Sequence, residues 1–256
     1  MQHAICSVPC SPVRSAPSHQ SEMVNQLIFG ESCSVSQIVK SEWVHIKSSF
    51  DNYEGFVQFS HLTEVESAEH ESIPVQLTAD WISTIEYNGV PMKIPLGSRL
   101  TGIRNGTLMQ DDNTIRFSGK TWDPKLAEKE FETLKNLCIQ FLNTAYLWGG
   151  KTVFGTDCSG FTQTIFQFFN ISLQRDAWQQ AEQGILVNSL EEARPADLAF
   201  FESPGGKITH VGIIMQSSEI IHASGKVRID RIDLGGILSS KTGNRTHILS
   251  RIKRFF

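Results

Sequence analysis

The residue types best suited to chemistry in this chain are one cysteine and two histidines in its C-terminal half. Cys158 follows the stretch Tyr146-Leu147-Trp148-Gly149-Gly150 and begins a run whose apolar residues share one helical face: Phe161, Ile165, Phe168 and Phe169. The unpaired N–H groups and the dipole at a helix N-terminus favour a thiolate, and such surroundings lower the pKa of a cysteine from about 8.5 to roughly 3.5–7.5. Either Asp157 or Ser159 can cap this helix, and Gly160 leaves room for a substrate backbone. Cys158 is therefore a candidate nucleophile, and the alternative is a small buried hydrophobic residue.

Two histidines follow in short segments that have the composition of strands. His210 lies within residues 208–215 and His222 within residues 219–225, both rich in β-branched residues and bounded by turn residues. A ribbon that turns through residues 216–218 would place them on adjacent strands. A cysteine nucleophile needs a base within hydrogen-bond reach and a third group that orients the base. His210 is the predicted base, because imidazole titrates near neutral pH, and His222 is the predicted orienting residue. Either histidine alone could instead be a surface residue or a hydrogen-bonded core residue.

The segment from about Leu126 to the C-terminus resembles the NlpC/P60 family of papain-like cysteine peptidases. The matching positions, in the family's order, are Tyr146-Leu147-Trp148-Gly149-Gly150, Asp157-Cys158-Ser159-Gly160-Phe161, Arg175-Asp176, Asp197-Leu198, His210-Val211-Gly212 and Ile221-His222-Ala223. The resemblance implies a triad of Cys158, His210 and His222. It also implies cleavage of peptide bonds in bacterial cell-wall stem peptides.

Other residues near the triad have predicted roles. Tyr146 is expected to point its hydroxyl at the oxyanion, with a packed aromatic side chain as the alternative. Trp148 is expected to form a wall of the cleft or to pack in the core. Asp157 and Ser159 are further predicted substrate contacts. Ala196 stands where the family usually has a glycine, a difference that we expect to be structural.

A binding site for the substrate's free α-amine is implied by one subset of the family, the members with SH3 domains that cleave γ-D-glutamyl–diamino acid bonds. In these members the aspartate of an Arg-Asp-Ser motif binds the amine. This implies the same role for Asp176, although Ala177 replaces the serine. The same members imply that Glu22 and Tyr53 complete the site, since a buried ammonium needs carboxylate partners. The alternatives are a surface charge for Glu22 and a core aromatic for Tyr53.

The N-terminal half is predicted to be all-β. Residues 35–39 and 43–46 alternate in hydrophobicity, and residues 42–44 followed by 53–57 resemble a bacterial SH3 domain. Residues 64–76 are polar and typical of a linker. A second β-rich stretch has a strong hairpin signal at Asp111-Asp112-Asn113 and is predicted to form another SH3-like barrel, with one larger barrel across both halves as the alternative. We therefore divide the chain into SH3-like domain 1 (1–65), SH3-like domain 2 (75–122) and a peptidase domain (123–256).

The peptidase domain is predicted to be α+β. Asp123-Pro124 is expected to begin its first helix, with aspartate as the cap and proline at the first position, and Cys138 falls on the apolar face of that helix. A further helix is predicted over residues 176–183, ended by Gly184. Strands are then predicted at 197–201, 209–215, 219–223, 227–232 and 247–252. Helices followed by an antiparallel sheet are the α+β order of papain-like folds.

Composition excludes several classes of function. The formal net charge is −4 with acidic and basic residues mixed, which argues against nucleic acid as the main partner. No run is apolar enough for a membrane span, and the first residues lack the basic start and apolar core of a signal peptide. The five cysteines are an odd number in no metal-type spacing, as is typical of reduced thiols in a cytoplasmic protein. We expect a cytoplasmic monomer that uses no cofactor and no metal; a removed signal would make it periplasmic.

The predicted function is that of a cysteine peptidase acting on murein stem peptides with a free N-terminal L-Ala. It would hydrolyse the bond between γ-D-Glu and the L-diamino acid and release L-Ala-γ-D-Glu for recycling. The alternatives are a secreted or periplasmic endopeptidase acting on intact wall, a non-catalytic SH3 wall-binding protein, a zinc enzyme with Cys158, His210 and His222 as ligands, and an acyltransferase or amidase on the same broad fold. Diaminopimelate and lysine both remain open at the third position of the stem peptide.

Overall fold

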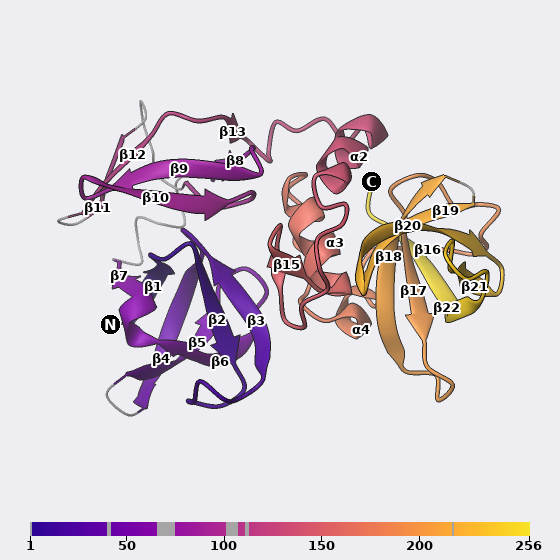
Figure 1. Ribbon diagram of the computed structural model, residues 1–256, viewed down its shortest axis with the longest axis horizontal. Helices are drawn as coiled ribbons and strands as arrows, with labels where there is room; N and C mark the ends of the chain where they lie inside the picture. The colour runs from indigo at the N-terminus through magenta and orange to yellow at the C-terminus, as the bar shows by residue number, and fades with distance from the viewer. Residues whose placement is uncertain (1, 40–41, 66–74, 101–106, 111–112, 217) are drawn as a thin grey trace. The chain divides into compact units, whose positions relative to one another are not determined.

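The computed structural model describes residues 2–39, 42–65, 75–100, 107–110, 113–216 and 218–256. The chain divides into two compact units, Met1–Ala127 and Glu128–Phe256, which Figure 1 colours from indigo to magenta and from rose to yellow. Within the described ranges every helix is too short or too polar to span a lipid bilayer.

A seven-stranded antiparallel sheet forms the first part of the N-terminal unit, in the order β3-β2-β6-β5-β4-β1-β7. Its elements are β1 (His3–Cys6), β2 (Cys10–Arg14), β3 (Met23–Ile28), β4 (Ser32–Val39), β5 (Trp43–Ser48), β6 (Glu54–Gln58), a 3-10 turn η1 (Phe59–His61) and β7 (Leu62–Glu64). Alternate side chains such as Val44, Ile46 and Val57 point into one apolar core. This confirms the predicted all-β SH3-like fold, and Trp43, which is 5% exposed, is one of its core aromatics.

The second β-rich stretch forms a four-stranded sheet and a separate two-stranded sheet within the same unit. Its strands are β8 (Leu77–Thr78), β9 (Ile82–Tyr87), β10 (Val90–Pro95), β11 (Thr107–Gln110), β12 (Asn113–Phe117) and β13 (Thr121–Trp122), with the four-stranded order β10-β9-β12-β11 and a β13-β8 pair. Phe29, which follows β3, packs into the core of the four-stranded sheet against Ile85 and Ile94. The next residue, Gly30, has φ +79°, and an added Cβ would collide with the carbonyl of Arg99. The two β-rich stretches therefore share core contacts, and the division into domains at 1–65 and 75–122 remains a prediction.

Several predicted connections fall partly outside the described residues. They are residues 66–74 of the linker, residues 101–106 of the second β-rich stretch, Asp111 and Asp112 of the hairpin turn, and residue 217 of the ribbon between the histidines. The strands beside the two turns are described, and they pair antiparallel, Gln110 with Asn113 and Ile213 with Ile221. Both hairpins are therefore confirmed.

Three helices, α2 (Phe131–Ile139), α3 (Cys158–Gln167) and α4 (Ala177–Gln180), begin the C-terminal unit. The predicted start of the first helix at Asp123 is wrong. Asp123 is instead the first residue of a turn. Its carboxylate accepts from the Lys125 N–H at 2.9 Å, and its carbonyl accepts from the Leu126 N–H at 3.2 Å. Asp-Pro is also a strong turn signal, with proline at the second position, and here the turn prevails. The buried face was predicted correctly, since Cys138 is fully buried in α2.

The helix predicted over residues 176–183 is also shorter than expected. Only Ala177–Gln180 is α-helical, and the following turn ends at Gly184, which has φ +70°. Between α2 and α3 the chain forms a small hairpin of β14 (Lys151–Thr152) and β15 (Gly155–Thr156).

A closed antiparallel barrel completes the C-terminal unit (Figure 1). Its sheet has the order β16-β22-β17-β18-β19-β20-β21, and a further pairing of β21 with β22 closes the barrel. The strands are β16 (Ile185–Val187), β17 (Leu198–Glu202), β18 (Ile208–Gln216), β19 (Glu219–Ser224), β20 (Lys226–Asp233), β21 (Gly236–Leu238) and β22 (Arg245–Arg254). All five predicted strands are present, and β16 and β21 were not predicted.

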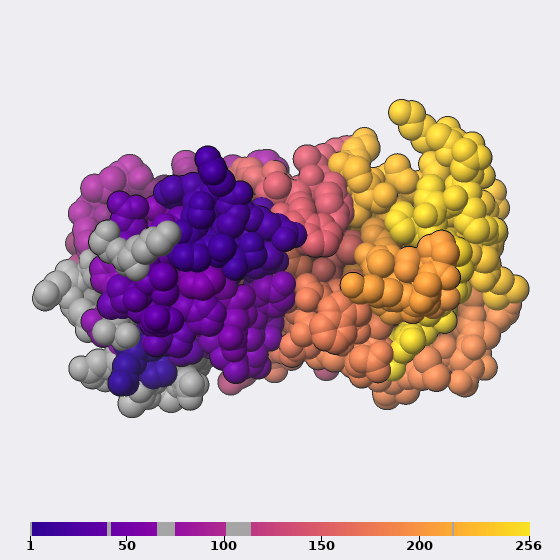
Figure 2. Space-filling view, turned by 90° about the horizontal axis from the view of Figure 1, so that it is seen from below, coloured from indigo at the N-terminus to yellow at the C-terminus, as the bar shows by residue number. Residues whose placement is uncertain are grey.

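The interior of the barrel is filled by apolar side chains from most of its strands, including Phe201, Ile214, Ile220, Ile232 and Ile252. The helices lie beside the barrel, and the space-filling view shows both as one continuous packed body from rose through orange to yellow (Figure 2). Helices followed by an antiparallel sheet are the predicted α+β architecture, and α3 packs against β18.

Candidate active site

Cys158 is the first residue of α3, the position that the sequence predicts. The capping residue is Asp157, whose Oδ1 accepts a hydrogen bond from the Gly160 N–H at 2.7 Å. The helix is buried along its whole length and packs against β18, the strand that carries His210. Cys158 is 6% exposed, and its thiol interacts with the N–H of Val211, the residue after His210. The packing of α3 on β18 therefore brings the nucleophile and the predicted base to neighbouring positions.

The acidity of Cys158 differs from the prediction. Burial raises the pKa of the thiol to about 12, and the adjacent Asp157 carboxylate adds to the rise. The Val211 N–H and the Arg175 guanidinium act in the opposite direction but do not overcome it. The predicted lowering of the pKa is therefore wrong for the resting site, because lost hydration outweighs the helix dipole. The resting cysteine is a neutral thiol that needs a base to lose its proton.

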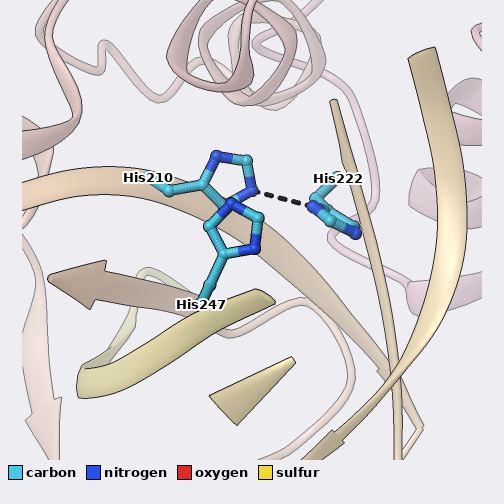
Figure 3. Close-up of side chains that lie close together, drawn as sticks. All are labelled: His210, His222 and His247. Atoms are coloured by element: carbon cyan, nitrogen blue, oxygen red, sulfur yellow. Dashed lines mark hydrogen bonds between the residues drawn. The ribbon is translucent and has the colours of Figure 1, made fainter. Parts of the chain in front are cut away.

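His210 and His222 lie on the adjacent antiparallel strands β18 and β19, as predicted. The register pairs Ile213 with Ile221, which places the two histidines diagonally on the same face of the sheet. His210 Nε2 lies 2.8 Å from His222 Nδ1, and both rings are buried (Figure 3). The predicted contact between base and orienting residue is therefore present.

Gly212 makes this diagonal contact possible. It lies opposite His222 across the two strands, and a Cβ added at Gly212 would come within 2.9 Å of the His222 Cβ and 2.8 Å of Ile220 Cδ1. A side chain at this position would displace the His222 ring. The glycine of the His210-Val211-Gly212 stretch thus leaves room for the contact between the two histidines.

Asp230 extends the pair to a third strand, and the sequence did not predict it. His222 Nε2 lies 3.1 Å from Asp230 Oδ2, on β20, and the other carboxylate oxygen accepts from the Ser240 N–H at 2.8 Å. Burial alone would raise the pKa of Asp230, but the hydrogen bonds from His222 and Ser240 outweigh it and hold the pKa below its usual range. The carboxylate is therefore ionised at neutral pH and accepts a hydrogen bond from His222.

The hydrogen bond between His222 and Asp230 fixes the tautomers of His222 and His210. Because Asp230 accepts, His222 carries its proton on Nε2 and presents a lone pair at Nδ1. His210 must then donate from Nε2, so its lone pair lies at Nδ1. Burial, followed by the charges of His222 and His247, lowers the pKa of His210 well below its ordinary value. His210 is thus a neutral base with its accepting nitrogen directed away from His222.

A third imidazole, His247 on β22, was also not predicted. Its ring stacks on that of His210 with centroids 4.0 Å apart and planes 23° from parallel (Figure 3). Burial and the neighbouring His222 lower the pKa of His247 to about 4, so the ring is neutral at pH 7. The sequence gives a weak indication of both residues that were not predicted. Asp230 is an acidic residue within one predicted strand, and His247 is the first residue of another.

A buried ion pair holds the loop before Cys158. The Arg175 guanidinium binds both carboxylate oxygens of Asp157, at 3.0 and 2.6 Å, and also contacts Ser159 Oγ at 3.0 Å. Asp157 Oδ2 further accepts from the Gly149 N–H at 2.9 Å. Asp157 and Ser159 are thus engaged in positioning the nucleophile, and their predicted contact with substrate remains a prediction.

The remaining predicted residues differ in how exposed they are. Tyr146 is partly buried, and burial followed by the nearby Cys158 raises the pKa of its hydroxyl, which places the phenol near the thiol. Trp148 is 60% exposed, so the alternative of a core residue is wrong. Asp176 is the N-cap of α4 and is partly exposed. Glu22, which is exposed, and Tyr53 lie in the N-terminal unit, and their place in an amine site remains a prediction.

The predicted zinc alternative is not supported by the geometry. In the part of the chain that the structure describes, the side chains close enough to share a metal ion are His210, His222 and His247, whose ligand atoms lie within 4.8 Å of one another. Cys158 does not belong to this cluster. The thiol and the two predicted histidines therefore do not form a preformed zinc site.

Comparisons with known proteins identify a family for each of two segments of the chain. Residues 143–245 match the model of the NlpC/P60 family, and residues 13–62 match that of the bacterial dipeptidyl-peptidase SH3 domain. A gamma-D-glutamyl-L-lysine dipeptidyl-peptidase from Bacillus cereus is 33% identical over 122 residues, which are 46% of this chain and 36% of that relative. A probable endopeptidase from Haemophilus influenzae is 32% identical over 142 residues, 54% of this chain and 80% of that relative. The match thus spans about a third of the first relative and most of the second.

The fold has a solved counterpart along its whole length. The crystal structure of an NlpC/P60 family protein from Bacillus cereus superposes with a TM-score of 0.84 at 18% identity, covering 98% of this chain and 99% of that chain. A thiol at the start of a buried helix that packs against a barrel strand with a histidine is the arrangement of papain-like cysteine hydrolases. Within that class the chain belongs to the NlpC/P60 family of cysteine peptidases, and it carries a bacterial SH3 domain in its N-terminal unit.

Proposed function

We propose that the chain hydrolyses the bond between γ-D-Glu and the L-diamino acid in murein stem peptides whose N-terminal L-Ala is free. The observation that carries the proposal is the directed line of hydrogen bonds from Asp230 through His222 to His210. These hydrogen bonds leave Nδ1 as the nitrogen of His210 that can accept a proton. A neutral thiol and a neutral, oriented imidazole are the starting state of general-base attack on a carbonyl.

The first step forms an acyl-enzyme. Cys158 Sγ attacks the γ-carbonyl carbon of D-Glu while its proton passes to His210 Nδ1, and the carbonyl π electrons move to oxygen. Backbone N–H groups at the start of α3 have no partner within the helix and can stabilise the oxyanion, together with the Tyr146 hydroxyl. One such donor contributes about 2.7–4 kcal/mol in a well-studied hydrolase.

The intermediate then collapses. The C–N bond breaks, the amine of the diamino acid takes the proton from His210 Nδ1, and the thioester of L-Ala-γ-D-Glu remains on Cys158. Water attacks this thioester, with His210 as base for the water and then as acid for the sulfur. During both steps Asp230 stabilises the positive charge that His210 and His222 share.

The substrate class rests on the relative and on the amine site. The Bacillus cereus relative is named for a γ-D-glutamyl-L-lysine bond and for release of a dipeptide. In this chain Asp176 is the carboxylate of the C-terminal unit that would hold the free amine of L-Ala, and the same role for Glu22 and Tyr53 of the N-terminal unit is implied by the family resemblance alone. Ala177 supplies no hydroxyl at the position of the usual serine, so the amine would lose one hydrogen bond.

The experiment that tests this function compares two tripeptides. L-Ala-γ-D-Glu-diaminopimelate is incubated with the protein beside the same peptide acetylated at its N-terminus, and lysine replaces diaminopimelate in a second pair. Products are identified by mass spectrometry, with Cys158→Ala as control. Release of L-Ala-γ-D-Glu from the free peptides only, lost in the control, is the expected result. Absence of cleavage in all four peptides would contradict the proposed function and would favour a wall-binding protein.

A second candidate is an endopeptidase that acts on intact cell wall, favoured by the name of the Haemophilus influenzae relative. Equal cleavage of free and acetylated peptides would support this candidate and contradict the amine site. The proposal extends to a cytoplasmic recycling role, because a stem peptide with a free N-terminus is a fragment of wall turnover. Detection of the protein outside the cytoplasm after cell fractionation would contradict that extension.

A further inference from the structure

Three imidazoles converge inside one end of the barrel, and the peptidase mechanism uses only two of them. His210, His222 and His247 come from β18, β19 and β22, and one ring nitrogen of each lies within 4.8 Å of the others (Figure 3). We propose that these three side chains form an inhibitory site for a divalent transition-metal ion, with Zn²⁺ as the best fit. The site itself is independent of the proposed substrate, and the inhibition rests on the role of His210 in the proposed function.

The donor set suits zinc. Neutral imidazole is a preferred ligand of Zn²⁺, and three histidines with one open position are a known coordination set. All three rings are held neutral by their surroundings, so none has to release a proton to bind. An anion such as hydroxide or chloride, or a water molecule, can take the fourth position.

Asp230 supplies the outer support that metal-binding histidines usually have. A ligating imidazole commonly donates its other N–H to a carboxylate, which fixes the ring and strengthens the ligand. His222 donates from Nε2 to Asp230 Oδ2 at 3.1 Å and presents Nδ1 to the cluster. The orienting residue of the proposed mechanism is thus also a prearranged metal ligand.

The positive charge nearest the cluster is already paired. Arg228, which lies opposite His222 on β20, has its Nε 2.8 Å from Asp230 Oδ2. The two charges of this ion pair offset each other. A dication among the three rings therefore meets a carboxylate and a guanidinium, and not an isolated positive charge.

The metal-bound arrangement needs side-chain rotations at more than one of the three histidines. His210 and His247 are stacked, so their in-plane lone pairs do not meet at one point as the rings now lie. His247 is less buried than the other two, and its Nδ1 contacts Thr246 Oγ1 at 2.9 Å. A rotation about its χ angles would turn Nε2 toward the other two rings. His210 Nε2 and His222 Nδ1, now 2.8 Å apart, would also separate to about 3.3 Å, the spacing of two nitrogens bound tetrahedrally to one zinc ion.

Metal binding would inhibit by changing the tautomer of the base. In the resting site His210 carries its proton on Nε2, which donates to His222, and accepts at Nδ1. A metal at Nε2 takes the place of that proton, which then resides on Nδ1 of the same ring. The nitrogen that accepts the proton of Cys158 is thereby occupied, and general-base catalysis stops while the cysteine remains unmodified.

The binding test uses Co²⁺ as a spectroscopic stand-in for Zn²⁺ in the full chain with Cys158→Ala. A tetrahedral d–d spectrum that saturates at one equivalent is expected, without a sulfur charge-transfer band. The spectrum should be lost in Cys158→Ala/His247→Phe, where phenylalanine preserves the stacked ring, and retained in Cys158→Ala/His3→Phe, the same change at an exposed histidine. No Co²⁺ spectrum in Cys158→Ala, or an unchanged one in the His247→Phe double variant, would overturn the site.

The inhibition test measures peptide cleavage against buffered free Zn²⁺. The Zn²⁺ concentration for half-inhibition should rise by about tenfold or more in His247→Phe and in His247→Gln, each compared with its own metal-free rate. Equal half-inhibition in wild type and both variants would overturn the inhibitory role, because the metal would then act at the Cys158 thiol. The Co²⁺ result stands whether or not the substrate has been assigned correctly.

Discussion

Replacement of Asp230 by asparagine tests the part of the site that the sequence did not predict. In the structure Asp230 is separated from the base by His222 and two hydrogen bonds of 3.1 and 2.8 Å. With about 2 Å between the two nitrogens of an imidazole, the carboxylate charge is at most about 8 Å from His210 Nε2, which corresponds to about 2 kcal/mol at an effective dielectric constant of about 20. Asparagine has nearly the same shape and can still accept from His222 through its oxygen, so the change removes the charge together with the hydrogen bond from the Ser240 N–H.

The expected consequence is a loss of about 30-fold in kcat/KM, since 1.36 kcal/mol corresponds to a factor of ten in rate. The physical reason is that the positive charge that develops on His210 and His222 loses its carboxylate, while Arg228 is left unpaired beside it. The assay is release of L-Ala-γ-D-Glu from the free tripeptide, followed by mass spectrometry. Thermal unfolding of each variant shows whether the fold is retained.

Asp233→Asn is the matched control, because Asp233 lies on the same strand but pairs with Arg245 at the surface. Its kcat/KM should equal that of wild type. A folded Asp230→Asn variant whose kcat/KM stays within about threefold of wild type would refute the reasoning. The hydrogen bond between His222 and Asp230 would then hold the structure without contributing to the reaction.

Three further predictions concern Gly212, Ala196 and the pH dependence of the reaction. Gly212→Ala should lower kcat/KM by about 100-fold, because its methyl group would displace His222 from His210, whereas Gly205→Ala, where an added Cβ meets nothing within 4 Å, should leave it unchanged. Ala196→Gly should raise the free energy of unfolding in urea by about 0.5–1 kcal/mol, because Ala196 has φ +76° and relief of that strain exceeds the entropy that glycine adds to the unfolded chain; equal or lower stability would contradict this. The acid limb of kcat/KM should have its midpoint well below pH 6.5, because the base must be neutral and the pKa of His210 is lowered by burial; a midpoint at or above 6.5 would show that His210 is not the titrating base.

The residues that carry the reaction could be predicted from the sequence where the signal was local. The apolar spacing after Cys158 indicated the helix that it begins, and the composition around His210 and His222 indicated two neighbouring strands. Ala196 was expected to be a structural replacement of glycine, and its positive φ confirms this.

Residues whose position depends on contacts across the barrel could not be predicted in this way. Along β20 the apolar residues Val227 and Ile229 suggest that Asp230 faces solvent, yet Ile229 is 38% exposed and Asp230 is 2% exposed. His247 lies near His210 because β22 and β18 both pair with β17, an arrangement that brings together segments far apart in the chain.

Two of the predictions from sequence, the helix start at Asp123 and the pKa of Cys158, were wrong because two physical effects compete in each case. Asp123-Pro124 satisfies the rules for a helix start and for a turn, and only the residues that follow decide between them. The pKa of Cys158 depends on both a helix dipole and burial, and the extent of burial is a tertiary property that local sequence does not reveal.

The most direct test of the central claim is the mass of the acyl-enzyme. The full chain is mixed with L-Ala-γ-D-Glu-diaminopimelate, quenched in acid at early times, digested and analysed by mass spectrometry. The account predicts an L-Ala-γ-D-Glu adduct on the peptide that contains Cys158, formed faster than product accumulates at steady state and absent in Cys158→Ala. Cleavage that persists in Cys158→Ala, or an adduct on one of the other four cysteines, Cys6, Cys10, Cys33 and Cys138, would contradict it.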